Sequence, residues 1–128
     1  MWPARCPLCG EALAHVQDED FCEPCRDTVQ VLEEPLCRVC GTPFKSVSVP
    51  AQRKCGACLI KAPRFDAARA YGEYRGALAQ SVRDLKYRKR RSVLPVLKRF
   101  IQEADEKHLA GSSFEMIIPV PLHRLTLR

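Results

Sequence analysis

The sequence reads Cys6-Pro7-Leu8-Cys9-Gly10 in its first part and repeats the pattern as Cys37-Arg38-Val39-Cys40-Gly41. In each stretch two residues separate the cysteines, and a glycine follows the second cysteine. A Cys-x-x-Cys turn directs two sulfur atoms at one point about 2.3 Å away, as a tetrahedral zinc ion requires. Glycine suits the tight turn that follows, because its backbone tolerates a positive φ angle. The two stretches therefore predict two zinc knuckles.

All eight cysteines of the 128-residue chain belong to such pairs. Two pairs separated by a dozen or so residues approach the spacing of a four-thiolate zinc ribbon, so the chain is predicted to contain a tandem duplication, with units at about 5–32 and 36–61. The expected metal is structural Zn²⁺, one ion per unit. A cross-braced arrangement, in which the first pair joins the third, uses the same residues and stays open. The predicted ligands are Cys6, Cys9, Cys22, Cys25, Cys37, Cys40, Cys55 and Cys58.

Three other uses of these cysteines compete with zinc. Disulfides suit an oxidising compartment, whereas thioredoxin-type chemistry needs a single Cys-x-x-Cys beside a βαβ pattern. Iron in a rubredoxin-like site uses the same four thiolates and remains open beside zinc. His15 lies between two ligand pairs and is interpreted as a loop residue. Four thiolates leave no open coordination position, which indicates a structural metal and not a catalytic one.

Charge is divided unevenly along the chain. Residues 1–62 carry seven basic and eight acidic side chains, a net charge of −1, while residues 63–128 carry fourteen basic and seven acidic ones, a net charge of +7. Each Zn²⁺ with four thiolates adds −2, so the cysteine-rich half becomes more acidic and is a poor candidate for gripping nucleic acid. We expect a cytoplasmic protein without a signal peptide, because the first residues lack an apolar run and no stretch is long enough to span a membrane.

The basic side chains concentrate in Lys86-Tyr87-Arg88-Lys89-Arg90-Arg91. A cluster of this kind could neutralise the phosphates of single-stranded DNA in a salt-sensitive way. The same residues also suit the end of a helix, where cations complement the helix dipole. Both interpretations stay open.

The pattern changes after Ala62-Pro63, and the second half is predicted to alternate strands and helices. Strands are expected at 65–71 and 116–122, and one hairpin strand of the second zinc unit at 44–49. Apolar residues at 74, 78, 82 and 85 predict a helix, and a second helix is expected to be capped by Ser92 and to stop at Gly111. Its predicted buried stripe contains Val93, Leu97, Phe100 or Ile101, and Ala104. The order strand–helix–helix–strand is typical of an α/β domain.

Three further stretches carry a resemblance to a known family. Tyr71-Gly72-Glu73-Tyr74, Leu85-Lys86-Tyr87-Arg88 and Ile118-Pro119-Val120-Pro121-Leu122-His123-Arg124 follow the four cysteine pairs in that order. Together they resemble the N-terminal half of the ComF family, whose members join a double zinc ribbon to a phosphoribosyltransferase-like domain and are associated with competence, DNA uptake and nucleotide salvage. The resemblance runs from Cys6 to Arg128, and places His123 and Arg124 near the family's active-site cleft.

The resemblance implies a small double zinc ribbon at 1–62 followed by an incomplete α/β, phosphoribosyltransferase-like domain at 63–128. The family's loop for phosphoribosyl pyrophosphate does not occur in this sequence, so we expect a truncated form without catalytic activity. Expected partners are single-stranded DNA or a helicase or other protein of DNA uptake. The candidate phosphate-binding residues are Lys86, Arg88, Lys89, Arg90, Arg91, His123 and Arg124. A zinc-ribbon adaptor between proteins and a nucleic-acid-binding zinc protein are the alternatives.

Overall fold

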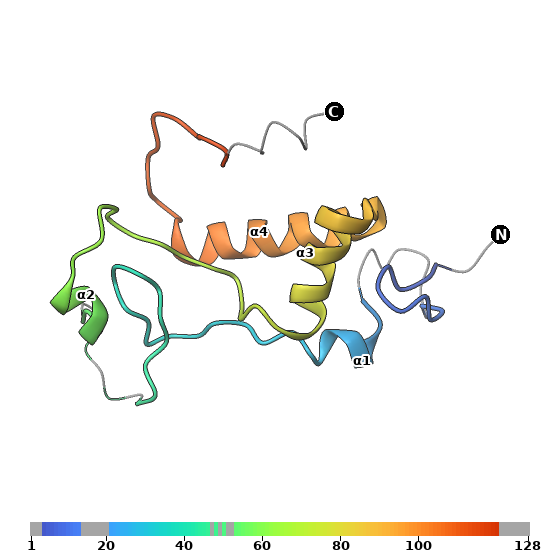
Figure 1. Ribbon diagram of the computed structural model, residues 1–128, viewed down its shortest axis with the longest axis horizontal. Coiled ribbons are helices and arrows are strands. Elements are labelled where there is room, and N and C mark those ends of the chain that lie inside the picture. The colour runs from blue at the N-terminus through green and yellow to red at the C-terminus, as the bar shows by residue number, and fades with distance from the viewer. Residues whose placement is uncertain (1–3, 14–20, 47, 49, 51–52, 121–128) are drawn as a thin grey trace.

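The computed structural model describes residues 4–13, 21–46, 48, 50 and 53–120. This part of the chain has one cysteine-rich unit at each end of an elongated body, with two long helices beside the first unit (Figure 1). The helices are α1 (Glu23–Arg26), α2 (Gly56–Ile60), α3 (Gly76–Arg88) and α4 (Leu94–His108), and a short 3₁₀ helix at Arg91–Val93 precedes α4. None of the helices in these ranges is long and apolar enough to cross a membrane.

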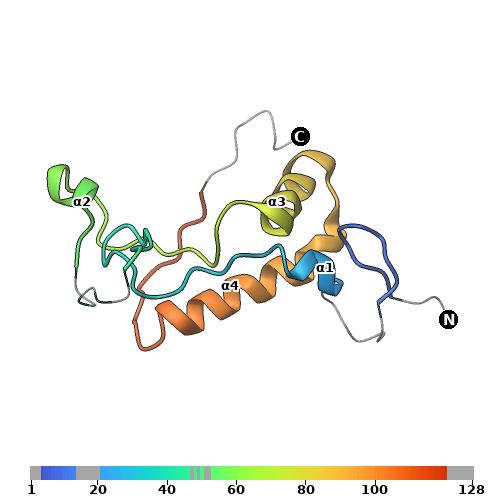
Figure 2. The ribbon, with the colours of Figure 1, turned by 90° about the horizontal axis from the view of Figure 1, so that it is seen from below.

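Two extended segments connect the two ends of the body. Residues 28–36 lead out to the second unit and residues 66–75 lead back, and they run side by side in both views (Figures 1 and 2). The Leu32 N–H donates to the Tyr71 carbonyl over 3.0 Å, and the Glu73 N–H donates to the Gln30 carbonyl over 2.8 Å. The pairing is antiparallel and centres on a single bridge between Val31 and Gly72.

Helix α3 begins where the returning segment meets the first unit. The Ala77 N–H donates to the Thr28 hydroxyl over 2.9 Å, which satisfies one of the free donors of the first turn. A β-carbon on Gly76, whose φ is +53°, would lie 2.3 Å from the Thr28 carbonyl oxygen, so only glycine fits here. The helix ends at Arg88, and the C-cap Lys89 adopts a left-handed conformation with φ of 54°. Apolar positions 78, 82 and 85 recur along the helix, which confirms the predicted helix, whereas Tyr74 lies before its first residue.

The main core lies between the first cysteine-rich unit and the two long helices. Its buried members are Cys6, Leu8, Phe21, Cys22, Ala77, Val96 and Phe100. The ring of Phe100 stacks on Tyr71 with centroids 4.3 Å apart and meets the Phe21 ring edge-on at 5.9 Å. The second unit has its own small cluster of Cys37, Val39 and Cys58. The first unit, and not the second, therefore supports α3 and α4.

Several predicted elements are wrong. No strand occurs in the described residues: 65–71 forms no ladder, 116–120 is exposed chain, and the described part of 44–49 is irregular, with Val47 and Val49 outside the described residues. An extended stretch becomes a strand only when its N–H and C=O groups pair with a neighbour in a continuous ladder. Here the backbone bonds are isolated, from the Ala68 N–H to the Val39 carbonyl and from the Leu32 N–H to the Tyr71 carbonyl beside the bridge at Gly72. An α/β arrangement of residues 63–120 is therefore not seen.

The second predicted helix is confirmed, but not its cap. Ser92 lies in the 3₁₀ helix, and Val93 is the N-cap of α4 without a side-chain hydrogen bond. Val93 and Phe100 are buried as expected, whereas Ile101 is 70% exposed. The helix ends at His108, and Gly111, with φ of +80°, follows in the turn after it.

Candidate metal centres

Each cysteine-rich unit gathers four sulfur atoms. The first site contains Cys6, Cys9, Cys22 and Cys25, the second contains Cys37, Cys40, Cys55 and Cys58, and within each site all Sγ atoms lie within 4.8 Å of one another. A tetrahedral zinc–thiolate centre needs Sγ separations of about 3.8 Å. The Cys9–Cys22 and Cys40–Cys55 sulfurs are already 3.4 and 3.5 Å apart. These residues fit two structural Zn²⁺ ions, and the pairs combine sequentially without cross-bracing.

The two knuckles are built by the same backbone hydrogen bonds. In the first, the Cys6 N–H donates to Glu11 and the Gly10 N–H to Cys6; in the second, Cys37 donates to Thr42 and Gly41 to Cys37. Gly10 and Gly41 have φ angles of +83° and +70°, as the turn was predicted to require. The other ligand pair of each site begins a short helix, because Cys22 and Cys55 are the N-caps of α1 and α2. The two units of the tandem duplication therefore share the same pattern of backbone hydrogen bonds.

Backbone donors prepare one thiol of each site for ionisation. Burial disfavours the Cys37 thiolate, but N–H groups of Cys40, Cys55 and Val39 donate to its sulfur and lower the pKa of Cys37 to about 6. Burial likewise opposes ionisation of Cys6, yet donors from Cys9, Cys22 and Leu8 lower the pKa of Cys6 to about 7. One of these bonds, from the Cys55 N–H to the Cys37 Sγ, measures 3.2 Å.

The last cysteine of each site behaves in the opposite way. Burial and then the neighbouring thiols Cys40 and Cys55 raise the pKa of Cys58 to about 12. Burial and the thiol of Cys22 also raise the pKa of Cys25. Four thiolates repel one another unless a cation lies among them, so Zn²⁺ must displace these protons as it binds. This chemistry suits a closed metal centre, where the ion supplies folding energy and has no position for substrate.

Arginines from the second half of the chain support both knuckles. Arg90 Nη1 donates to the Leu8 carbonyl over 3.2 Å, and Arg69 Nη2 donates to the Arg38 carbonyl over 3.1 Å. Both carbonyls lie between the two cysteines of a knuckle, next to a centre whose net charge is −2 when zinc is bound. Such outer contacts orient the ligands and offset the charge. No local pattern predicts these contacts, since Arg90 and Leu8 are 82 positions apart.

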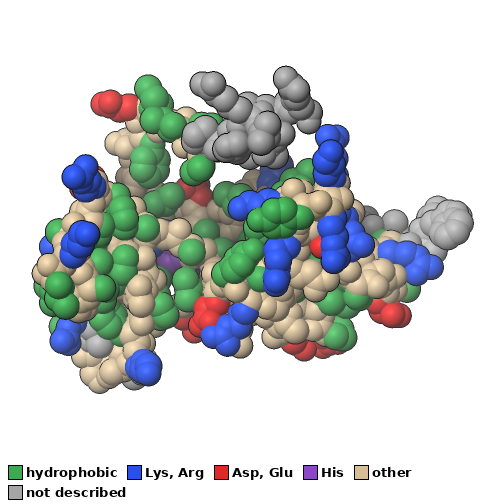
Figure 3. Space-filling view, viewed as in Figure 1, with side chains coloured by type: hydrophobic (Ala, Val, Ile, Leu, Met, Phe, Trp, Pro, Cys, Tyr) green, Lys and Arg blue, Asp and Glu red, His purple; other side chains and the backbone are tan. Residues whose placement is uncertain are grey.

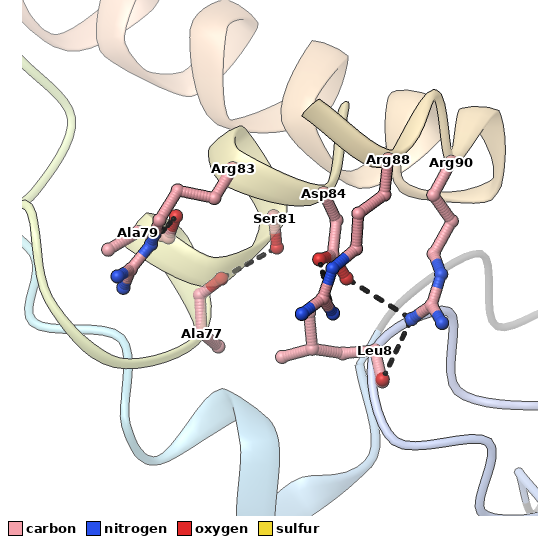
Figure 4. A network of polar contacts seen from close by, with 8 residues as sticks. All are labelled: Leu8, Ala77, Ala79, Ser81, Arg83, Asp84, Arg88 and Arg90. Carbon is pink, nitrogen blue, oxygen red and sulfur yellow. Dashed lines mark hydrogen bonds and ion pairs between the residues drawn. The ribbon is translucent and has the colours of Figure 1, made fainter. Parts of the chain in front are cut away.

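Arg90 is also part of an ion-pair cluster at the end of α3 (Figure 4). Asp84 is 2% exposed, and its two carboxylate oxygens accept from Arg90 over 3.1 Å and from Arg88 over 3.2 Å. Asp84 and Arg88 are spaced i,i+4 on α3, and this spacing is the one local signal for the cluster. Two of the five cations in the basic run, Arg88 and Arg90, are therefore paired with a buried carboxylate.

The remaining candidate residues separate into two groups. Lys86, Lys89 and Arg91 are exposed near the end of α3, and no ion pair involves them among the described residues. His15, His123 and Arg124 lie outside the described residues. The structure therefore places three exposed cations near the end of α3, whereas the predicted phosphate-binding residues His123 and Arg124 are not among the described residues.

Comparison with known proteins supports the metal centres. Residues 1–59 match the family model of the double zinc ribbon domain. Searches of the curated proteins and of the solved structures found no match to the chain. The match contains all eight cysteines that form the two sites. The first part of this chain is therefore a double zinc ribbon, with two four-cysteine sites for structural Zn²⁺.

Proposed function

We propose that this chain is a ComF-like protein in which two structural zinc ions position a helical segment for a role in DNA uptake or nucleotide salvage. The order of the motifs supports the proposal, since the stretches at 71–74, 85–88 and 118–124 follow a double zinc ribbon as in that family. The observation that carries the scaffold role is the shared core, in which Cys6 and Cys22 pack with Val96 and Phe100. The first zinc ion thereby fixes α3 and α4.

The proposed role is binding, and not phosphoribosyl transfer by this chain alone. Each zinc site uses four thiolates and so offers no Lewis-acid position. A domain boundary near residue 62 and a phosphoribosyltransferase-like relationship of residues 63–128 belong to the same proposal, although residues 63–120 contain no strand.

A genetic test addresses this proposal directly. A naturally competent bacterium that lacks its own ComF-like gene is expected to regain DNA uptake when it expresses the chain. A variant with Cys6 and Cys9 changed to serine is expected not to restore uptake, because the scaffold is lost. Release of pyrophosphate from phosphoribosyl pyrophosphate by the purified chain with Mg²⁺ and a nucleobase would contradict the noncatalytic role.

A second candidate function is binding of single-stranded DNA by the basic end of α3. Lys and Arg side chains gather on the part of the surface where α3 ends (Figure 3). Tyr87 lies among them with 79% of its surface exposed, which leaves its ring available for stacking on a base. Three exposed cations and one aromatic ring form a small but suitable contact for a strand.

Neutralising Lys86, Lys89 and Arg91 to glutamine is expected to weaken binding of an oligothymidine strand. Three lost phosphate contacts should reduce the slope of log K against log salt by about 2. Fluorescence anisotropy at several salt concentrations measures this slope. The matched control changes Lys45, Lys54 and Lys61 of the second unit, which removes the same charge elsewhere. Equal weakening by both triple variants, or none, would exclude a site at α3.

A further inference from the structure

An apolar groove runs between the two long helices. It has a volume of about 500 Å³ and is lined almost wholly by hydrophobic side chains. The returning segment closes one side of it through Tyr71, Gly72 and Tyr74. Its wall residues from α3 and α4 are Leu78, Val82, Leu85, Leu94, Leu97 and Ile101. None of the zinc ligands and none of the exposed cations at the end of α3 lines the groove.

The same chain carries an exposed apolar segment just after α4. Residues 114–120 read Phe-Glu-Met-Ile-Ile-Pro-Val, and Ile117 and Val120 are each 90% exposed. Phe114, Met116 and Ile118 are between 61% and 77% exposed. The segment rises from the end of α4, and apolar side chains project from it (Figures 1 and 3). A contiguous apolar stretch of this kind normally marks a contact surface.

We propose that residues 114–120 form a strap that folds back along α4 and fills the groove of its own chain. The structure shows this strap in its open position. The groove begins near Ile101 and continues to Leu94, which is about 10 Å of helix at 1.5 Å per residue. An extended segment of seven residues spans about 20 Å and so covers that length.

The segment between α4 and the strap is long enough for the chain to turn back along the helix. Residues 109–113 join them and include Gly111, with φ of +80°, and a turn in which the Ser112 N–H donates to Leu109. Five residues reach about 17 Å, enough to return the chain from His108 to the level of Ile101. A tether this short gives millimolar effective concentration, so the strap of the same chain outcompetes that of a second copy at micromolar protein.

The pattern of the strap matches a groove with one open side. In an extended chain Phe114, Met116, Ile118 and Val120 lie on one face, while Glu115, Ile117 and Pro119 lie on the other. The first face is wholly apolar and suits the hydrophobic walls. Glu115 then faces water, beside the rim where Lys98 lies. The closed strap therefore controls whether the groove is open to another apolar surface.

Photo-crosslinking from the strap tests the closed position. With p-benzoylphenylalanine in place of Phe114, irradiation of the zinc-loaded chain is expected to yield an intramolecular cross-link to the peptides 76–88 or 94–102, identified by mass spectrometry. A cross-link between two chains would assign the groove to a second copy, and the absence of any cross-link to these helices would leave the strap open; either result overturns the proposal.

Two variants separate strap docking from general misfolding. Ile101→Asp changes a groove residue that is 70% exposed, so α4 should tolerate it, but the cross-link is expected to be lost. The strap variant Met116→Asp/Ile118→Asp is expected to raise the fluorescence of a groove-binding hydrophobic dye, whereas Glu115→Gln on the other face leaves it unchanged. Both variants should retain two zinc equivalents and wild-type helicity. An unchanged cross-link in Ile101→Asp, or unchanged dye binding in the strap variant, would contradict the proposal, which stands apart from any role in DNA uptake.

Discussion

Changing Cys6 and Cys9 to serine is expected to unfold α3 and α4 together with the first zinc unit, whereas the same change at Cys37 and Cys40 leaves both helices folded. The reason is that the two zinc sites belong to two separate apolar clusters. Cys6 and Cys22 pack in one cluster with Ala77, Val96 and Phe100, while the apolar cluster of the second site contains, among the described residues, only members of its own unit. A structural zinc ion supplies about 10 kcal/mol or more, which is comparable to the whole stability of a small domain.

Far-UV circular dichroism and zinc analysis together measure this asymmetry. Helices α3 and α4 contain 13 and 15 residues, against 4 and 5 in α1 and α2, so the helical signal reports chiefly on the long pair. The first-site variant should lose most of this signal and the second-site variant little of it. Each variant is the matched control of the other, because both remove two thiols of one knuckle.

Two results would contradict the asymmetry. Equal loss of helical signal in both variants would mean that the second unit also supports the helices, through the bonds from Ala68 to Val39 and from Arg69 to Arg38. A wild-type signal after complete removal of zinc by a chelator would mean that the ions contribute nothing to the fold. Oxidation of the thiols is excluded by keeping a reductant present throughout.

The metal centres could be predicted from the sequence because their determinants are local. A Cys-x-x-Cys turn with a following glycine fixes its own geometry, and the spacing of Cys6, Cys9, Cys22 and Cys25 favoured one self-contained unit. Helix α3 was similarly evident, since its apolar positions recur at the helical period. These elements need only interactions between residues that are close in sequence.

The features that could not be predicted depend on contacts between residues that are far apart in the sequence. An alternating or apolar stretch such as 65–71 becomes a strand only if a neighbour pairs with it, and the sequence does not specify that neighbour. The contact from Arg90 to the Leu8 carbonyl likewise joins residues 82 positions apart. The basic run at 86–91 could be predicted to end a helix. Which of its cations pair with a carboxylate and which stay exposed could not be predicted, because the pairing depends on the burial of Asp84.

Replacing Asp84 with alanine is expected to destabilise the chain by about 2 kcal/mol and to weaken zinc binding at the first site. Asp84 is 2% exposed, and both of its oxygens bind guanidinium groups. Breaking a buried ion pair costs about 3–5 kcal/mol when the remaining charge stays buried. The side chains of Arg88 and Arg90 are 69% and 43% exposed and can turn toward water, which reduces that penalty.

The effect on zinc follows from the second contact of Arg90. Without Asp84 to orient it, the guanidinium no longer holds the Leu8 carbonyl of the first knuckle. Loss of an outer contact of this kind typically lowers metal affinity by about 10-fold or more. Competition with a chromophoric chelator should therefore show weaker retention of one of the two zinc ions, with the second unchanged.

A control and a double-mutant cycle isolate the buried cluster. Glu103→Ala removes the exposed pair with Arg99, whose Nε–Oε1 distance is 3.3 Å, and is expected to cost at most about 0.5 kcal/mol. If Asp84 acts through Arg90, the double variant Asp84→Ala/Arg90→Ala should lose less zinc affinity, as a free energy, than the sum of the losses in the two single variants. Additive effects would show that the carboxylate and the zinc knuckle are independent. A loss of stability in Asp84→Ala with both zinc ions retained as in the wild type would confine the role of Asp84 to the end of α3, and the coupling between that helix and the first metal centre would then rest on the shared apolar core alone.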